Sequence, residues 1–217
     1  MPQTLSLTFD DGPEERCSAR IVETLRQCAT TGTFFMVGER VRSAPALARS
    51  ILEAGNDVQL HCHRHIRHTE LSELEIDRDT HEALTALEQI GVRPSHWRTP
   101  WGIRTAASER VARRHRLRLV NWTIDTHDWR GDAASAMLSH VRSQLVGASI
   151  VLMHDGLGPG ARRGDCENTV ALLEPLIMTA RDEGFEVGPL VHRAERTPAP
   201  ASPRAGLRAA AAIGQDA

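Results

Sequence analysis

Short apolar segments typical of strands alternate with longer segments of helical periodicity along most of this chain, and this alternation constrains its fold more than any other feature. Residues Thr4–Phe9 form the first strand-like segment. Residues Ile21–Cys28 then carry apolar side chains at helical spacing, and residues Thr33–Val37 form a second, buried strand-like segment. Repeated strand–helix units of this kind build a largely parallel sheet or barrel, so we expect an α/β fold.

The same rhythm continues over most of the remaining chain. We expect further strands at Asp57–Leu60, His96–Arg98, Leu117–Ile124, Ser149–Met153 and Glu186–Leu190. We expect helices at Ala44–Ala54, Ser72–Ile90, Thr105–His115, Ala133–Leu145 and Asn168–Glu183. Pro175 should kink or reset the last of these helices, because proline removes a backbone donor and its ring crowds the preceding turn.

The length of the chain favours a single folded unit. The 217 residues, 41% of them hydrophobic, are enough for one sizeable core and too few for two independent domains. From Arg193 onward the composition changes to alanine, proline, arginine and glycine, with few bulky apolar side chains. We therefore expect one folded domain over residues 1–192 and a disordered tail over residues 193–217.

Charge and composition exclude several classes of partner. Charged residues make up 25% of the chain and the formal net charge is only -2, so we expect no nucleic acid and no anionic membrane as a partner. No run approaches the roughly 18 apolar residues that a membrane helix needs, and the first residues lack the pattern of an export signal, so we expect a cytoplasmic protein. The four cysteines show no CxxC pair, and we expect reduced thiols at Cys17, Cys28, Cys62 and Cys166.

Polar clusters follow directly after the predicted strands, at the end where barrels and open α/β sheets place their active sites. The first cluster is the adjacent pair Asp10 and Asp11, which precedes Gly12 and Pro13. One carboxylate could hold a metal ion while the other takes a proton from water. The alternative is a turn that uses aspartate and glycine for its backbone conformation alone.

The second cluster is rich in histidine, since four of the eleven histidines fall within residues 61–68. His61 and His65 are four residues apart and can converge on one Zn²⁺ if the segment makes a helical turn. His63 would then face elsewhere, and His68 lies one turn beyond His65. The alternative is a solvated basic loop that binds nothing in particular.

Three further clusters follow later strands, at Arg98–Gly102, Trp122–Trp129 and Ile150–Gly156. In the first, a guanidinium could orient a carboxylate and keep it charged. The second combines two acids with two indoles, and the third brings His154 to the tip of a buried strand. For each of these clusters taken alone, a structural role is an equally good interpretation.

In their order along the chain, these five segments resemble the motifs of the polysaccharide deacetylases, also called the NodB homology group or carbohydrate esterase family 4. The resemblance covers residues 5 to about 191, and Thr33–Gly38 is similar to the second strand of that family. It implies a distorted, NodB-like (β/α) barrel of about seven or eight strands. It also implies a metal-dependent hydrolase that removes an N-acyl group, above all N-acetyl, from an amino sugar, an oligosaccharide or a small N-acylated metabolite.

The resemblance further implies a role for each residue that matches a motif. Asp10 corresponds to the catalytic base, and Arg98 should position it. Asp11, His61 and His65 correspond to the ligands of one divalent ion. Zn²⁺ is the first choice for these ligands, and Co²⁺, Ni²⁺ or Fe²⁺ also suits them.

The remaining matches concern proton transfer and the pocket. His154 corresponds to the general acid, and Asp128 should tune it. Leu152 and Trp129 should line the acyl pocket, and the backbone N–H at Trp101 should help to hold the oxyanion. An acid and a base on opposite sides of the carbonyl are what amide hydrolysis requires.

Three departures from the family pattern bear on whether the substrate is a polymer and leave the implied mechanism intact. Cys62 stands in place of the usual serine or threonine, Trp101 stands in place of the usual tyrosine, and no export signal is evident. A relative on the same fold could open a cyclic amide or imide, or could bind a carbohydrate without cleaving it. A histidine loop that only stores or senses metal is a further alternative.

Overall fold

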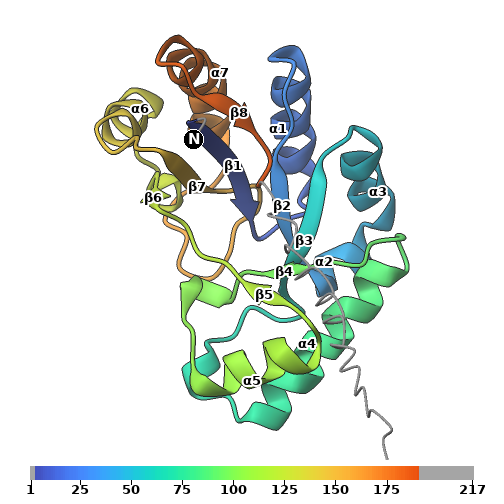
Figure 1. Cartoon of the computed structure of the whole chain (residues 1–217). Coiled ribbons are helices and arrows are strands. Elements are labelled where there is room, and N and C mark those ends of the chain that lie inside the picture. Colours follow the sequence, from blue (N-terminus) through green and yellow to red (C-terminus); the bar gives the residue numbers. More distant parts are fainter. Residues whose placement is uncertain (1–2, 191–217) are drawn as a thin grey trace, which may run out of the picture.

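The computed structural model describes residues 3–190 and contains one parallel sheet that curls into an open barrel (Figure 1). The strands are β1 (Thr4–Asp10), β2 (Thr33–Val37), β3 (Asp57–Cys62), β4 (His96–Trp97), β5 (Arg118–Leu119), β6 (Ile124–Asp125), β7 (Ala148–His154) and β8 (Glu186–Gly188). Their order is β5-β4-β3-β2-β1-β7-β6, with β8 paired to β1. Within residues 3–190 no ladder joins β5 to β6. The predicted distorted barrel of seven or eight strands is confirmed.

Helices follow most of the strands and lie outside the sheet (Figure 1). The α-helices are α1 (Glu15–Gln27), α2 (Gly38–Ser43), α3 (Pro45–Glu53), α4 (Glu73–Glu88), α5 (Ala106–Arg114), α6 (Ala134–Arg142) and α7 (Glu167–Asp182). Short 3₁₀ turns are η1 (His68–Glu70), η2 (Pro100–Gly102) and η3 (Asp128–Arg130). The start of α4 has a local cause, because the Ser72 hydroxyl accepts the Glu75 N–H while the Glu75 carboxylate accepts the Ser72 N–H.

Strand β1 is the centre of the sheet and has partners along both edges. All of β1 pairs with β7, from Thr4 beside Ala148 to Asp10 beside His154. On the other edge, its second half pairs with β2 and its first half pairs with β8. Leu5, Leu7 and Phe9 are at most 1% exposed and enter the core, so the alternating residues, including Asp10, lie on the opposite face of the strand.

The structure corrects one predicted strand and one predicted helix. Residues 117–124 do not form a single strand, because β5 pairs with β4 while β6 pairs with β7 at the other end of the sheet. The intervening chain crosses between them. Helix α7 runs unbroken through Pro175, so the expectation of a reset there is wrong. Leu172 and Leu176, on either side of the proline, are fully buried, and this packing favours a continuous helix.

A disulfide joins Cys17 in α1 to Cys166, which directly precedes α7. The expectation of reduced thiols is therefore wrong for these two cysteines, whereas Cys28 and Cys62 are free. The pair lies 149 residues apart in sequence, but α1 packs against α7, and the two Cα atoms are 5.6 Å apart. This bond ties the segment after β1 to the segment after β7.

The predicted tail of residues 193–217 lies outside the described residues, as does the last part of the predicted domain of residues 1–192. Among the residues that the structure describes, none of the helices has the length and apolar character needed to cross a membrane.

The disulfide should stabilise the folded protein, because it closes a long loop and so restricts the unfolded chain. Reduction, or the double change Cys17→Ser with Cys166→Ser, should lower the free energy of unfolding by roughly 3–5 kcal/mol. Urea unfolding with and without reductant measures this effect. Cys28→Ser is the control that leaves the disulfide intact. An unfolding midpoint that does not respond to reductant would contradict the bond.

Candidate active site

The carboxyl ends of β1, β3, β6 and β7 surround a cavity of about 360 Å³. Of the residues predicted for the site, those that line this cavity are Asp10, Asp11, His61, His65, Trp101, Trp129, Leu152 and His154. The other two, Arg98 and Asp128, lie behind the lining and contact it through Asp10 and His154. The structure therefore brings all of the predicted site residues together.

Three metal-ligating side chains meet on one side of the cavity. The Nε2 atoms of His61 and His65 lie 3.3 Å and 3.2 Å from Oδ1 of Asp11, and the three ligand atoms are all within 4.8 Å of one another. The helical turn expected for the two histidines is absent from this described segment: His61 lies in β3 and His65 lies in the loop that follows. The end of the strand and the turn of the loop, rather than helical spacing, bring the two rings together.

The donor set fits a divalent cation. His61 Nδ1 lies 2.7 Å from the Arg98 carbonyl oxygen and donates to it, so its Nε2 presents a lone pair toward Asp11. Asp11 Oδ1 is buried and has no hydrogen-bond partner among the described residues. A carboxylate oxygen that faces the lone pair of the His61 ring nitrogen at this distance needs positive charge between the two atoms. Two imidazoles and one carboxylate are a common ligand set for zinc.

Close packing against Asp11 explains why the loop after β7 is rich in glycine. Asp11 has a φ of 77°, a conformation that aspartate tolerates better than most residues. A Cβ atom at Gly158 would lie 2.0 Å from Asp11 Oδ2, and one at Gly156 would lie 2.6 Å from the Asp11 carbonyl oxygen. The Gly12 N–H donates to Asp155 Oδ1 over 3.0 Å. The loop after β7 therefore packs directly against Asp11.

Asp10 is buried and held by Arg98. The Arg98 Nη1 donates to Asp10 Oδ1 and to the Thr8 hydroxyl, each over 2.8 Å. The guanidinium also stacks 4.2 Å from the centre of the Phe35 ring and is fully buried. Burial lowers the pKa of Arg98 and the charge of Asp10 opposes that change. The ion pair thus orients the Asp10 carboxylate toward the cavity.

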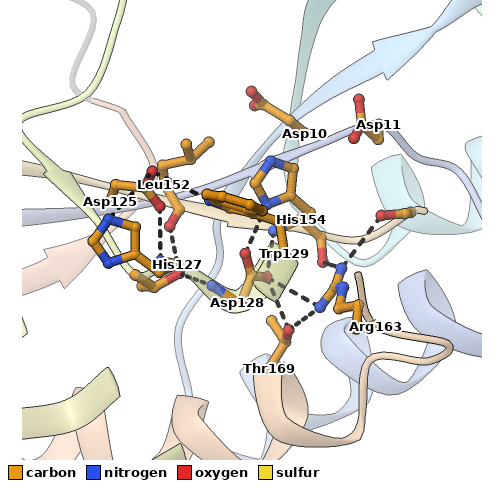
Figure 2. Close-up of polar contacts among 12 residues, drawn as sticks. Asp10, Asp11, Asp125, His127, Asp128, Trp129, Leu152, His154, Arg163 and Thr169 are labelled. Atoms are coloured by element: carbon orange, nitrogen blue, oxygen red, sulfur yellow. Dashed lines mark hydrogen bonds and ion pairs between the residues drawn. The ribbon is translucent and has the colours of Figure 1, made fainter. Parts of the chain in front are cut away.

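His154 is held by Asp128 at the end of β7 (Figure 2). Its Nδ1 lies 2.7 Å from Asp128 Oδ1, and its backbone N–H donates to Asp128 Oδ2 over 2.9 Å. Burial lowers the pKa of His154, but the charge and hydrogen bond of Asp128 outweigh it and raise the pKa to about 9. His154 is therefore protonated at neutral pH and can donate a proton from Nε2.

Arg163 and Thr169 complete this network and were not predicted from the sequence. Arg163 Nη1 donates to Asp128 Oδ2 over 3.1 Å and its Nη2 donates to the His154 carbonyl oxygen over 2.8 Å (Figure 2). The Thr169 hydroxyl donates to Asp128 Oδ2 over 2.9 Å. Burial raises the pKa of Asp128, yet its contacts with His154 and Arg163 lower it overall. Neither residue belongs to a recognisable motif, so only the folded structure reveals them: Arg163 lies in the loop after β7 and Thr169 lies in α7.

Asp155 is a further buried acid that the sequence reading did not single out. It accepts the Ser18 hydroxyl over 2.6 Å and the Gly12 N–H, and it is fully buried. Burial raises its pKa to about 7. Its position directly after His154 was the signal that could have identified it.

Aromatic side chains form the walls of the cavity. The Trp101 ring packs edge-on against His65, with ring centres 4.2 Å apart. The indole N–H of Trp129 donates to Asp125 Oδ2 over 3.4 Å, which fixes its ring beside Leu152 and His154 (Figure 2). These contacts leave an apolar wall next to the polar cluster.

The other members of the histidine cluster point elsewhere. His63 Nε2 lies 3.3 Å from Glu82 Oε2, and His68 Nδ1 lies 2.8 Å from the Ser108 hydroxyl. Burial lowers the pKa of His68 to about 4. Cys62 is buried, and burial raises the pKa of its thiol well above the usual value, so it remains protonated.

Comparisons with known proteins agree with this architecture. Residues 1–120 match the family model described as polysaccharide deacetylase. A chitooligosaccharide deacetylase from Bradyrhizobium sp. is 32% identical over 198 residues, which cover 87% of this chain and 89% of the relative. A peptidoglycan-N-acetylglucosamine deacetylase from Bacillus cereus is 27% identical over 83% of each chain.

A solved structure agrees as well. A family 4 carbohydrate esterase from Streptomyces lividans, in complex with acetate, superposes with a TM-score of 0.78 at 28% identity, over 86% of this chain and 92% of that one. The family model covers more than half of the 217 residues. The chain therefore belongs to the polysaccharide deacetylase family, with a NodB-type domain, and is a hydrolase of non-peptide C–N bonds.

Proposed function

We propose that this protein is a metal-dependent deacetylase that removes the N-acetyl group of an amino sugar or of an oligosaccharide of amino sugars. One observation carries the proposal: Asp10 and His154 are register partners on neighbouring strands and line the same cavity as the Asp11–His61–His65 cluster. A base and an acid next to a metal site are the groups that amide hydrolysis needs.

Asp11, His61 and His65 hold the divalent ion, which when bound polarises the acyl carbonyl and lowers the pKa of water. Asp10 accepts the proton of the attacking water. Arg98 orients the Asp10 carboxylate, because its guanidinium is buried against it. The resemblance to the family assigns the backbone N–H of Trp101 to the oxyanion.

His154 donates its proton to the departing nitrogen, so that the amine leaves in a neutral form. Asp128 keeps His154 protonated and fixes its ring through Nδ1. Arg163 and Thr169 hold the Asp128 carboxylate in place from the opposite side. Leu152 and Trp129 form the wall that receives the methyl group of the acetyl.

Indoles in the cavity wall support an amino-sugar substrate. Trp101, Trp122 and Trp129 all line the cavity, and broad aromatic faces suit the flat C–H surface of a sugar ring. The relatives named above are chitooligosaccharide and peptidoglycan N-acetylglucosamine deacetylases, which supports the same substrate class.

The cytoplasmic location expected from the sequence stays a prediction. The Cys17–Cys166 disulfide argues against it, because disulfides persist mainly in oxidising compartments.

A deacetylation screen with metal-reconstituted protein tests the proposal. The substrates are N-acetylglucosamine, its β-1,4 oligomers and N-acetyl amino acids, and the readout is acetate release. We expect turnover of the sugars that is lost with a chelator and restored by Zn²⁺. Turnover of none of the sugars would refute the proposal.

Removing a metal ligand should abolish metal binding. We expect Asp11→Ala, His61→Ala and His65→Ala each to lower the bound divalent ion from one per chain toward zero, because three ligands converge on one point. His63→Ala is the matched control, since His63 faces Glu82. Elemental analysis after dialysis measures the ion. Equal loss in His63→Ala would show that the ligand set is wrong.

Variants of Asp10 and His154 should distinguish the activation of water from the protonation of the leaving group. Asp10→Asn should abolish turnover and retain the metal, because it removes the base and spares the three ligands. His154→Ala should also retain the metal, but its defect should shrink on an activated aryl acetate, whose leaving group needs no proton. Comparing turnover of amide and ester checks both. An equal defect of His154→Ala on the two substrates would exclude the role of general acid.

The pH profile should report His154. Protonated His154 is the active form, so turnover should be present below its pKa and lost as pH rises through about 9. A bound divalent ion offsets part of the charge of the nearby aspartates, so this alkaline limb of the pH profile should fall at or below about pH 9. Asp128→Asn should move the limb to lower pH, because burial then acts without the opposing carboxylate. If the loss of turnover occurs at the same pH in Asp128→Asn as in the wild type, it does not report the titration of His154.

A further inference from the structure

We infer that Arg67 makes this enzyme selective for an N-acetyl amino sugar that carries a carboxylate, such as a lactyl ether on the ring. The inference rests on the proposed deacetylase function and names a narrower class of substrate for the same cavity. It assigns Arg67 to substrate recognition, not to the chemical step. The support is the position of its guanidinium, its free donors and the charges of the neighbouring groups.

Arg67 is placed at the cavity by an aromatic contact. It belongs to the loop after β3 that also carries His65, and its side chain lines the cavity. Its guanidinium carbon lies 4.1 Å from the centre of the Trp101 ring, and that ring lies 4.2 Å from the ring centre of His65. Two ring contacts therefore connect the guanidinium to a proposed metal ligand. The cation–π contact restrains the guanidinium without using its N–H donors.

The N–H donors of Arg67 are available to a ligand. No hydrogen bond joins its guanidinium to another residue in the range 3–190, and Glu70 Oε1 is 3.9 Å from Nε, beyond hydrogen-bond distance. The other arginine in the cavity wall, Arg163, already uses both of its Nη atoms, which donate to Asp128 and to backbone carbonyl oxygens, and its Nε is buried. Of these two arginines, Arg67 is the one that can still bind an anion.

The acids in the cavity wall already have partners. Asp10 pairs with Arg98, and Asp11 faces the two metal-ligating histidines. Asp125 accepts the His127 N–H over 2.7 Å and the indole N–H of Trp129. None of these acids therefore pairs with Arg67, and Glu70, its ion-pair partner at 3.9 Å, lies outside the cavity wall. A planar guanidinium with free donors binds a carboxylate through two parallel hydrogen bonds.

The test compares an acid with its isosteric amide. The probes are the 3-O-lactyl ether of N-acetylglucosamine and the same compound with its carboxylate converted to a primary amide, with acetate release as the readout. The wild-type ratio of kcat/KM for acid over amide should be about 10, the effect of one hydrogen-bonded charge pair at a half-exposed site. Arg67→Gln should lower this ratio to about 1, and Arg67→Lys should retain part of it because the charge remains.

Arg64→Gln is the matched control. Arg64 lies in the same loop, its side chain is exposed, and it faces Asp79 rather than the cavity. This variant should keep the wild-type ratio. Metal content and thermal unfolding of each variant separate a loss of selectivity from a loss of folding.

The possible outcomes are distinct. A ratio near 1 in the wild type, or an unchanged ratio in Arg67→Gln, refutes selectivity by Arg67 while the deacetylase function stands. Absence of turnover of both sugars and of unmodified N-acetylglucosamine refutes the deacetylase function itself. N-acetyl amino acids and their amides form a second pair of probes. If only this second pair gives a high acid-over-amide ratio of kcat/KM, and Arg67→Gln removes it, the amino sugar is the wrong source of the carboxylate.

Discussion

The pairing of β1 with β7 is the constraint on which the candidate site depends. This ladder places Asp10 beside His154 and sets the two loops that follow, one with Asp11 and one with Gly156 and Gly158, against each other. A shift of one residue in the register would turn every side chain of β1 to the other face. The core residues Leu5, Leu7 and Phe9 oppose such a shift, so the same packing that stabilises the sheet also aligns the acid and the base.

The sequence predicts those parts of the molecule whose signal is local. Thr33–Val37 is predicted with its observed bounds, and the candidate residues gather at one cavity because each follows a strand whose carboxyl end lies at the same edge. The crossing of residues 117–124, the disulfide and the position of Arg163 depend on neighbours that are distant in sequence. No property of these residues alone reports which segment they will meet in the folded chain.

Charge in this site is arranged in two ways. Asp128, His154 and Arg163 form a closed set in which each charged group is paired at low exposure, so loss of one member leaves the others buried without compensation. Arg67 lies at the same cavity but with donors that no described residue accepts. The set of Asp128, His154 and Arg163 is complete within the folded protein. The N–H donors of Arg67 find acceptors only when a ligand enters the cavity, so the two arginines have different roles.

The disulfide between the first and last α-helical regions also determines the result of proteolytic cleavage of the backbone. Cys17 and Cys166 enclose most of the described chain, including the histidine loop and the loop that carries Trp101. A protease that cuts one peptide bond between them produces two fragments that remain one covalent molecule. The sheet can then hold the fragments in register, and a nicked enzyme can keep its cavity intact. Such a molecule separates into its pieces only when it is both unfolded and reduced.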